Sequence, residues 1–138
     1  MNNPLIYICS PYRGDVENNI QKAKNYCRFV VEEGKCPLAP HLFFPQFLDD
    51  NIESERQQGL QLNSNFLNIC DELWVFGEEI SQGMQFEIDL AKHLNKKIIF
   101  FDEELNIIQK LNFKDLSLWK FYILFWKETK NEFRFNKI

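Results

Sequence analysis

Hydrophobic positions along residues 1–104 follow two periods that alternate with each other. Short runs of consecutive apolar residues, rich in β-branched and aromatic side chains, have the pattern of buried strands. Between these runs, apolar residues recur every three or four positions, as on one face of an amphipathic helix. The runs predict strands over 5–9, 37–40, 73–76 and 97–101, and the helical periods predict helices over 16–33, 52–69 (with a soft break at Gly59) and 82–94.

Strands that alternate with helices in this way are typical of a parallel sheet with right-handed crossovers. Asp15 can cap the first helix and Gly34 can end it. We therefore predict an α/β fold, a single three-layer parallel-sheet domain of the Rossmann or flavodoxin type. The aromatic segment 41–50 is too short to be a domain, and we interpret it as the lining of a cleft or a lid over it.

The pattern changes after residue 104. Leu116, Trp119, Ile123 and Trp126 share one helical face, and further aromatic residues crowd the other faces. A helix that is apolar nearly all round must be buried. We therefore predict an α/β domain over 1–104 and a helical, aromatic C-terminal extension over 105–138, which packs on that domain or on a second subunit of a homo-oligomer (a dimer or larger).

Charge is distributed unevenly between these two parts. Residues 1–104 carry 9 basic and 17 acidic side chains, a net charge of −8, whereas residues 105–138 carry 7 basic and 3 acidic ones, a net charge of +4. A basic tail can contact nucleic acid, but the acidic body would repel a phosphate backbone. We expect the tail to dock on its own domain or on a partner subunit, and nucleic acid not to be the partner.

Composition narrows the class of protein further. The 138 residues, 45% hydrophobic and 15% aromatic, are enough for a buried core and too apolar for a disordered chain. No apolar run approaches the roughly 20 residues of a membrane span and residues 1–4 are no signal peptide, so a cytoplasmic location is expected. Cys9, Cys27, Cys36 and Cys70 lack CxxC spacing, and we interpret them as buried thiols rather than a zinc site or a disulfide framework.

Four loops should meet at the carboxyl ends of the predicted strands, where open α/β sheets bind their ligands. Glu87 lies near the start of the helix that follows the third strand, and it can act as a nucleophile at a sugar carbon with Tyr7 orienting its carboxylate. Arg13, beside Gly14, can bind a phosphate bidentately. Ser81 precedes a helix whose free N–H groups favour an anion.

Each of these residues also has a plainer interpretation. Tyr7 alternates with core positions and can be a buried phenol, Arg13 can pair with Asp15, and Ser81 can be a helix cap. Glu87 can be a surface residue of an amphipathic helix. His41, between prolines and phenylalanines, is either a partly buried histidine whose ring nitrogens are hydrogen-bonded within the protein, or a site residue. Spacing alone leaves these alternatives open.

Two stretches at these positions resemble the nucleoside 2-deoxyribosyltransferase superfamily. They are the segment 7–14, Tyr-Ile-Cys-Ser-Pro-Tyr-Arg-Gly, and the segment 81–87, Ser-Gln-Gly-Met-Gln-Phe-Glu. The likeness covers about residues 5–101. It is closer to the 2'-deoxynucleoside 5'-phosphate N-hydrolases, because the transferases tend to have Asp where this chain has Ser81. An uncharacterised, phage-rich branch is closer still in its Ser-Pro-Tyr-Arg-Gly, Pro-His-Leu and Cys-Asp-Glu-Leu-Trp-Val-Phe-Gly stretches.

The resemblance implies a retaining attack on the anomeric carbon of a nucleoside or nucleoside 5'-monophosphate, with Glu87 forming a glycosyl-enzyme. Water or a second base would then complete hydrolysis or transfer, and no metal or cofactor is required. His41 and the segment 43–47 would face the base, and Tyr7 would support catalysis. Residues implied to bind the substrate are Ser10, Tyr12, Arg13, Gly14, Phe44, Ser81, Gly83 and Met84.

One position departs from the family pattern. Family enzymes carry an Asp on the helix before the central strand, and the matching position here is Asn63, which cannot exchange a proton as a carboxylic acid does. His41 or Glu55 is a candidate replacement, and Asp71 is interpreted as structural. The departure favours a second function, binding of a nucleotide-derived signalling molecule without turnover. A third, cleavage of an NAD-like or cyclic nucleotide signal by the same Glu87 chemistry, for example in phage anti-defence, cannot be separated from the first by the sequence.

Overall fold

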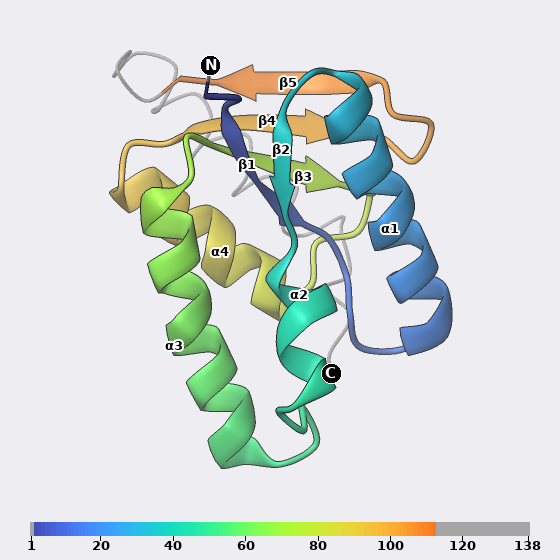
Figure 1. Cartoon of the computed structure of the whole chain (residues 1–138), viewed down its shortest axis with the longest axis vertical. Coiled ribbons are helices and arrows are strands. Elements are labelled where there is room, and N and C mark those ends of the chain that lie inside the picture. The colour runs from blue at the N-terminus through green and yellow to red at the C-terminus, as the bar shows by residue number, and fades with distance from the viewer. Residues whose placement is uncertain (1, 113–138) are drawn as a thin grey trace.

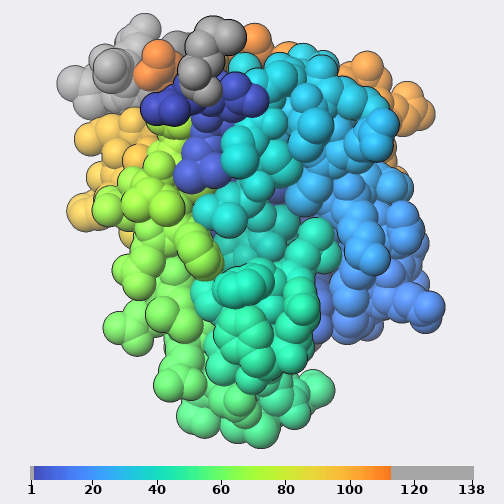
Figure 2. Space-filling model, viewed as in Figure 1, coloured from blue at the N-terminus to red at the C-terminus, as the bar shows by residue number. Residues whose placement is uncertain are grey.

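The computed structural model describes residues 2–112, and these residues form one sheet with helices on both faces (Figure 1). Short helical segments connect β2 to α3 on the face seen in Figure 2, where the teal part of the chain fills the space between α3 in green and α1 in blue. The elements, in chain order, are β1 (Leu5–Cys9), α1 (Val16–Glu32), β2 (Cys36–Leu38), α2 (Pro40–Phe43), the 3₁₀ helix η1 (Phe44–Gln46), α3 (Glu53–Ile69), β3 (Glu72–Phe76), α4 (Gln82–His93), β4 (Lys97–Phe101) and β5 (Ile107–Leu111).

The sheet has the strand order β2-β1-β3-β4-β5. The first four strands are parallel to their neighbours, as predicted, but β5 runs antiparallel to β4. This corrects both the all-parallel sheet and the assignment of residues 107–111 to a helical extension. The chain reverses because the Asp102 carboxylate accepts hydrogen bonds from the backbone N–H groups of Glu104 and Asn106, both at 2.9 Å. The rest of the predicted extension, 113–138, lies outside the described residues.

The three predicted layers are confirmed by the way β1 divides its side chains between the two faces of the sheet. Tyr7 and Cys9 belong to the core between the sheet and helices α3 and α4, whereas Ile6 and Ile8 belong to the core beneath α1. Successive strand residues point to opposite faces, so a strand covered on both faces is apolar at every position. The alternation places Tyr7 and Cys9 on the same side of the sheet as α4.

The connections after β1 and β3 leave the sheet in opposite directions. The chain passes from β1 to α1 on one face and from β3 to α4 on the other (Figure 1). The order of the first four strands is the flavodoxin-like one, in which a crevice opens between β1 and β3 at their carboxyl ends and ligands bind there. The topology therefore directs the search for a site to the loops that follow these two strands.

Several local expectations need correction. The second strand ends at Leu38, and Pro40 begins α2, because a proline is favoured in the first turn of a helix. Helix α3 continues through Gly59 without a break. The cysteines are not all buried: Cys9 and Cys70 are, Cys27 is partly exposed and Cys36 is exposed, and all four are free thiols.

Two further features of residues 2–112 concern the ends of elements. The Asp15 side chain caps α1, as predicted, and Asp71 accepts a hydrogen bond from the backbone N–H of Leu5 at 2.7 Å, which supports its structural interpretation.

No helix within the described residues is long and apolar enough to cross a bilayer.

Candidate functional site

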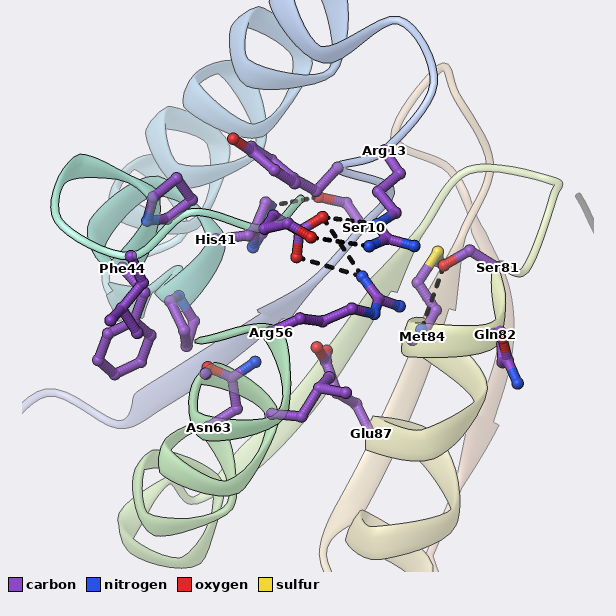
Figure 3. A pocket seen from close by; sticks show the side chains of 18 of the residues that line it. Ser10, Arg13, His41, Phe44, Arg56, Asn63, Ser81, Gln82, Met84 and Glu87 are labelled. Atoms are coloured by element: carbon purple, nitrogen blue, oxygen red, sulfur yellow. Dashed lines mark hydrogen bonds and ion pairs between the residues drawn. The ribbon is translucent and has the colours of Figure 1, made fainter. Parts of the chain in front are cut away.

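A cavity opens at the carboxyl ends of β1 and β3, where the topology places a ligand crevice (Figure 3). Its volume of about 110 Å³ is several times the roughly 10–15 Å³ that one water needs. Ten of the predicted site residues line it: Ser10, Tyr12, Arg13, His41, Phe44, Asn63, Ser81, Gly83, Met84 and Glu87. Gly14 does not; it lines a neighbouring, wider cavity. Tyr7 lies beneath the surface, with no exposed area.

Glu87 points into this cavity from the second turn of α4 (Figure 3). Met84, Ile88 and Ala91 form the buried stripe of that helix, and Glu87 shares their face one turn after Met84. Part of the residue is exposed through the cavity, but its carboxyl group is enclosed by protein. Burial raises the pKa of this carboxyl to about 8, against the smaller, opposing influence of the Cys9 thiol and the Tyr7 hydroxyl. At neutral pH the carboxyl of the free protein is mostly protonated.

Tyr7 is a buried phenol and also a neighbour of Glu87, so the two interpretations of this residue are not alternatives. Burial, followed by the charge of Glu87, raises its pKa well above the ordinary value, so it stays neutral and keeps its proton. No atom of residues 2–112 lies in full hydrogen-bonding geometry to its hydroxyl oxygen, although the Glu87 carboxyl is close enough to act on it. The hydroxyl is therefore available as a donor.

Cys9 is a neighbour of Glu87 that the sequence analysis did not assign to the site. Its thiol is fully buried, and burial, followed by the charge of Glu87, raises its pKa well above the ordinary value. The signal was present in the sequence, since residues two apart on a strand share a face. Cys9 and Tyr7 therefore approach the same carboxyl from one side.

The N-terminus of α4 forms another side of the cavity. The Ser81 hydroxyl accepts a hydrogen bond from the backbone N–H of Met84 at 3.2 Å. Ser81 is thus a helix cap, as its plainer interpretation held, and it also lines the cavity. The first N–H groups of a helix carry partial positive charge, so this end of α4 favours an anion.

His41 faces the cavity with one ring nitrogen already engaged. Its Nε2 lies 2.8 Å from the Ser10 hydroxyl oxygen. Burial lowers the pKa of His41 to about 4, so the imidazole is neutral at physiological pH. It can accept or donate a hydrogen bond to a ligand, but it holds no second proton to give.

This low pKa predicts that His41 makes the protein less stable in mild acid. Between about pH 6.5 and pH 4 the unfolded state binds a proton on His41 that the folded state does not, so stability falls as the pH falls. From pH 7 to pH 5 we expect wild type to lose about 1–2 kcal/mol more than His41→Gln, measured by urea denaturation. Equal losses in the two proteins would contradict the buried, neutral imidazole.

Arg13 pairs with Asp50 and not with Asp15, which corrects one of its predicted alternatives. Its Nε lies 2.6 Å from the carboxylate of Asp50, and its Nη2 donates to the Asp50 backbone carbonyl at 2.8 Å. Arg56, from the first turn of α3, reaches the same carboxylate at 3.2 Å. Asp50 and Arg56 could not be predicted as site residues from the sequence, since neither stands in a periodic or motif-like context.

Asn63 lines the cavity with its side-chain amide buried. Its Oδ1 has no hydrogen-bond partner among the described residues. Glu55, the other residue considered as a proton donor on this helix, also lines the cavity, and its carboxylate lies 3.5 Å from the backbone N of Asp49. Residues 2–112 contain no group of three or more side chains arranged to hold a metal ion.

A family model described as "Domain of unknown function (DUF7768)" matches residues 4–101. The chain belongs to this family. No curated protein sequence matches that of this DUF7768 protein.

Solved structures with this fold include a 2-deoxyribosyltransferase from the psychrotolerant bacterium Bacillus psychrosaccharolyticus. The match has a TM-score of 0.57 and 17% sequence identity, and it covers 76% of the DUF7768 chain and 77% of the transferase. This shared fold agrees with the fold that the sequence resemblance implies.

Two further structures superpose more loosely on the DUF7768 chain. The CMP N-glycosidase BcmB of Clostridium botulinum gives a TM-score of 0.49 at 20% identity over 70% of each chain. A 2-deoxyribosyltransferase from Leishmania mexicana gives 0.48 at 19% identity, over 72% of this chain and 64% of the transferase. With TM-scores below 0.5, they add nothing to the assignment of the fold.

Proposed function

We propose that this DUF7768 protein cleaves the N-glycosidic bond of a nucleoside 5'-monophosphate and passes the sugar to water or to a second base. The observation that carries the proposal is the enclosed Glu87 carboxyl, which faces a cavity at the β1/β3 crevice with a neutral phenol beside it. A carboxylate held in a protein cavity can add to the anomeric carbon of a sugar, and a phenol can hold it in the attacking orientation.

The reaction proceeds in two displacements at C1'. An oxygen of ionised Glu87 forms a bond to C1' while the bond from C1' to the base nitrogen breaks, and the base leaves with that electron pair and takes up a proton. Water or a second base then attacks C1', the bond from C1' to Glu87 breaks to release the carboxylate, and the attacking group loses its proton to solvent. Two inversions give net retention. Tyr7, whose raised pKa keeps its proton in place, donates a hydrogen bond to the carboxylate before the first displacement and after the second.

The rest of the cavity supplies binding. Arg13 and the N-terminus of α4, with Ser81 and Gly83, form a positive region suited to the phosphate. On the α2 side, the ring of Phe44 and the neutral imidazole of His41 offer an apolar face and a hydrogen bond to the base.

Protonation of the leaving base is the weak point of this site. The cation of His41 is scarce at neutral pH because its pKa is about 4, which leaves water as the acid. We expect Asn63→Asp to raise kcat by about tenfold or more, since general acid catalysis contributes about 10²–10⁴-fold where it operates. The rate of base release by the two proteins decides this, and an unchanged kcat would show that protonation of the base does not limit turnover.

A second candidate function is capture of a nucleotide-derived molecule without turnover. The amide at Asn63 favours it, because an amide binds a base edge but does not donate a proton as an acid. In that case the ligand would be recovered unchanged after long incubation with the protein.

Incubation with a panel of nucleosides and nucleotides tests both candidates at once. Chromatography should resolve the free base, the sugar product and the intact nucleotide after incubation with wild type and with Glu87→Gln. The proposed function predicts release of base from at least one 5'-monophosphate by wild type only. Tight binding of a monophosphate with no product in either protein would favour capture instead.

A further inference from the structure

Two arginines and one aspartate form a compact cluster on the wall of the Glu87 cavity. Arg13 comes from the loop after β1, Asp50 from the loop before α3, and Arg56 from the first turn of α3. All three line the cavity, and their side chains are only 24%, 27% and 16% exposed, in that order. Figure 3 shows the Arg56 guanidinium on the side of the cavity toward which Glu87 points.

The cluster carries one more positive than negative charge. Asp50 accepts hydrogen bonds from Arg13 Nε at 2.6 Å and from Arg56 Nη1 at 3.2 and 3.3 Å. A guanidinium has five N–H donors in a planar fork, and these contacts occupy one part of each fork. Asp50 thus offsets the repulsion between two neighbouring cations and leaves donors of both for a ligand.

One carboxylate on the cavity wall, Glu55, opposes this charge, and the other groups on the wall add partial positive charge or none. Among the ionisable side chains that line the cavity, His41 is neutral at physiological pH and Glu87 is mostly protonated. Glu55 is the remaining carboxylate on the cavity wall. The N-terminus of α4, on the same cavity, adds partial positive charge.

We propose that Arg56 and Arg13 together form a paired-guanidinium subsite for a phosphate group, and that Asp50 is the positioning residue that holds the pair in register. Bidentate guanidinium–phosphate contacts are strong and geometrically selective. Arg56 is then the residue that makes the protein prefer phosphorylated nucleosides over free ones. The nucleoside part of this inference rests on the proposed function; the phosphate subsite does not.

The test compares Arg56→Gln with Arg28→Gln, a matched loss of one arginine. Arg28 lies on α1 outside the cavity, where it is 77% exposed and pairs with Glu32. Asp50 keeps its contacts with Arg13 in Arg56→Gln, so no carboxylate is left unpaired and the fold should persist. Circular dichroism and thermal unfolding of the full chain establish that both variants are folded.

Isothermal titration calorimetry at fixed ionic strength then measures binding of inorganic phosphate, the four 2'-deoxynucleoside 5'-monophosphates and the four matching nucleosides. We expect Arg56→Gln to weaken binding of phosphate and of the preferred nucleotide about tenfold to a hundredfold, and binding of the nucleoside less than about twofold. Arg28→Gln should bind all of them as wild type does. A general loss of structure would weaken nucleotide and nucleoside alike, so the ratio of the two affinities is the decisive quantity.

Three results would overturn the inference: equal weakening of nucleotide and nucleoside, unchanged nucleotide affinity in Arg56→Gln, or a wild type that binds neither phosphate nor any monophosphate. The proposed function fails in a different way, through the absence of base release. Binding of phosphate that depends on Arg56, without turnover of any nucleotide, would keep the subsite and reject the glycosidase. Base release that does not depend on Arg56 would keep the glycosidase and reject the subsite.

Discussion

Replacement of Glu87 by glutamine is expected to reduce base release by about a thousandfold or more, while the protein stays folded and still binds nucleotide. Glutamine has nearly the shape of the acid, but its amide cannot form the ester bond to C1' on which both displacements depend. Loss of a covalent nucleophile removes a group that acts only in the transition state, so the effect should fall on kcat rather than on substrate affinity. Release of base under single-turnover conditions, with excess enzyme, measures it.

The control for this variant lies on the same helix. Asp89→Asn also removes one carboxylate from α4, but Asp89 is 60% exposed and does not line the cavity. It should therefore keep wild-type turnover. Base release that is equal in Glu87→Gln and in wild type would remove Glu87 from the mechanism.

The raised pKa of Glu87 predicts that activity increases with pH through the neutral range. Burial raises this pKa to about 8, and only the ionised carboxylate attacks C1'. Below about pH 8, kcat/KM should fall about tenfold for each unit of pH, because kcat/KM reports the ionisation of the free enzyme. Tyr7→Phe removes a group that lowers this pKa, so the rise should shift to higher pH in that variant. A flat profile between pH 6 and pH 8 would contradict the buried nucleophile.

The same ionisation can be followed without substrate. The folded state keeps the proton of Glu87 up to about pH 8, whereas the unfolded chain loses it near pH 4.5. Stability therefore falls as the pH rises from about 4.5 to 8, by up to about 1.4 kcal/mol per unit. Glu87→Gln escapes this loss, so between pH 5 and pH 8 its stability relative to wild type should increase by about 2–4 kcal/mol. Urea denaturation at the two pH values measures the difference.

The parallel part of the fold could be predicted because its strands are covered on both faces. Ile6, Tyr7, Ile8 and Cys9 are all buried, so the run is apolar at every position and ends at a clear polar loop. The antiparallel β5 gave no such signal, since Ile107 and Ile108 are exposed on it. Predicting this strand would have required recognising the chain reversal after β4. That reversal depends on hydrogen bonds from the backbone of Glu104 and Asn106 to the Asp102 carboxylate.

The site residues also differ in whether the sequence could predict them. Glu87 and Ser81 could be placed from the sequence because they belong to the start of a helix that follows a buried strand, and a helix start can be recognised from its cap and its period. The contact of Arg13 with Asp50 could not, since it joins two loops that are 37 residues apart. Arg56 belongs to α3, but the helical period of α3 does not predict that the Arg56 side chain lies beside Arg13, which comes from a separate loop.

The central claim is that Glu87 becomes covalently bonded to the sugar during the reaction. Wild type should be mixed with the nucleotide that releases base fastest, quenched in acid within one turnover, digested and analysed by mass spectrometry. A sugar phosphate adduct on Glu87 should form as base is released and disappear as product accumulates. Base release without an adduct on Glu87 at any time of quenching, together with full activity of Glu87→Gln, would contradict it.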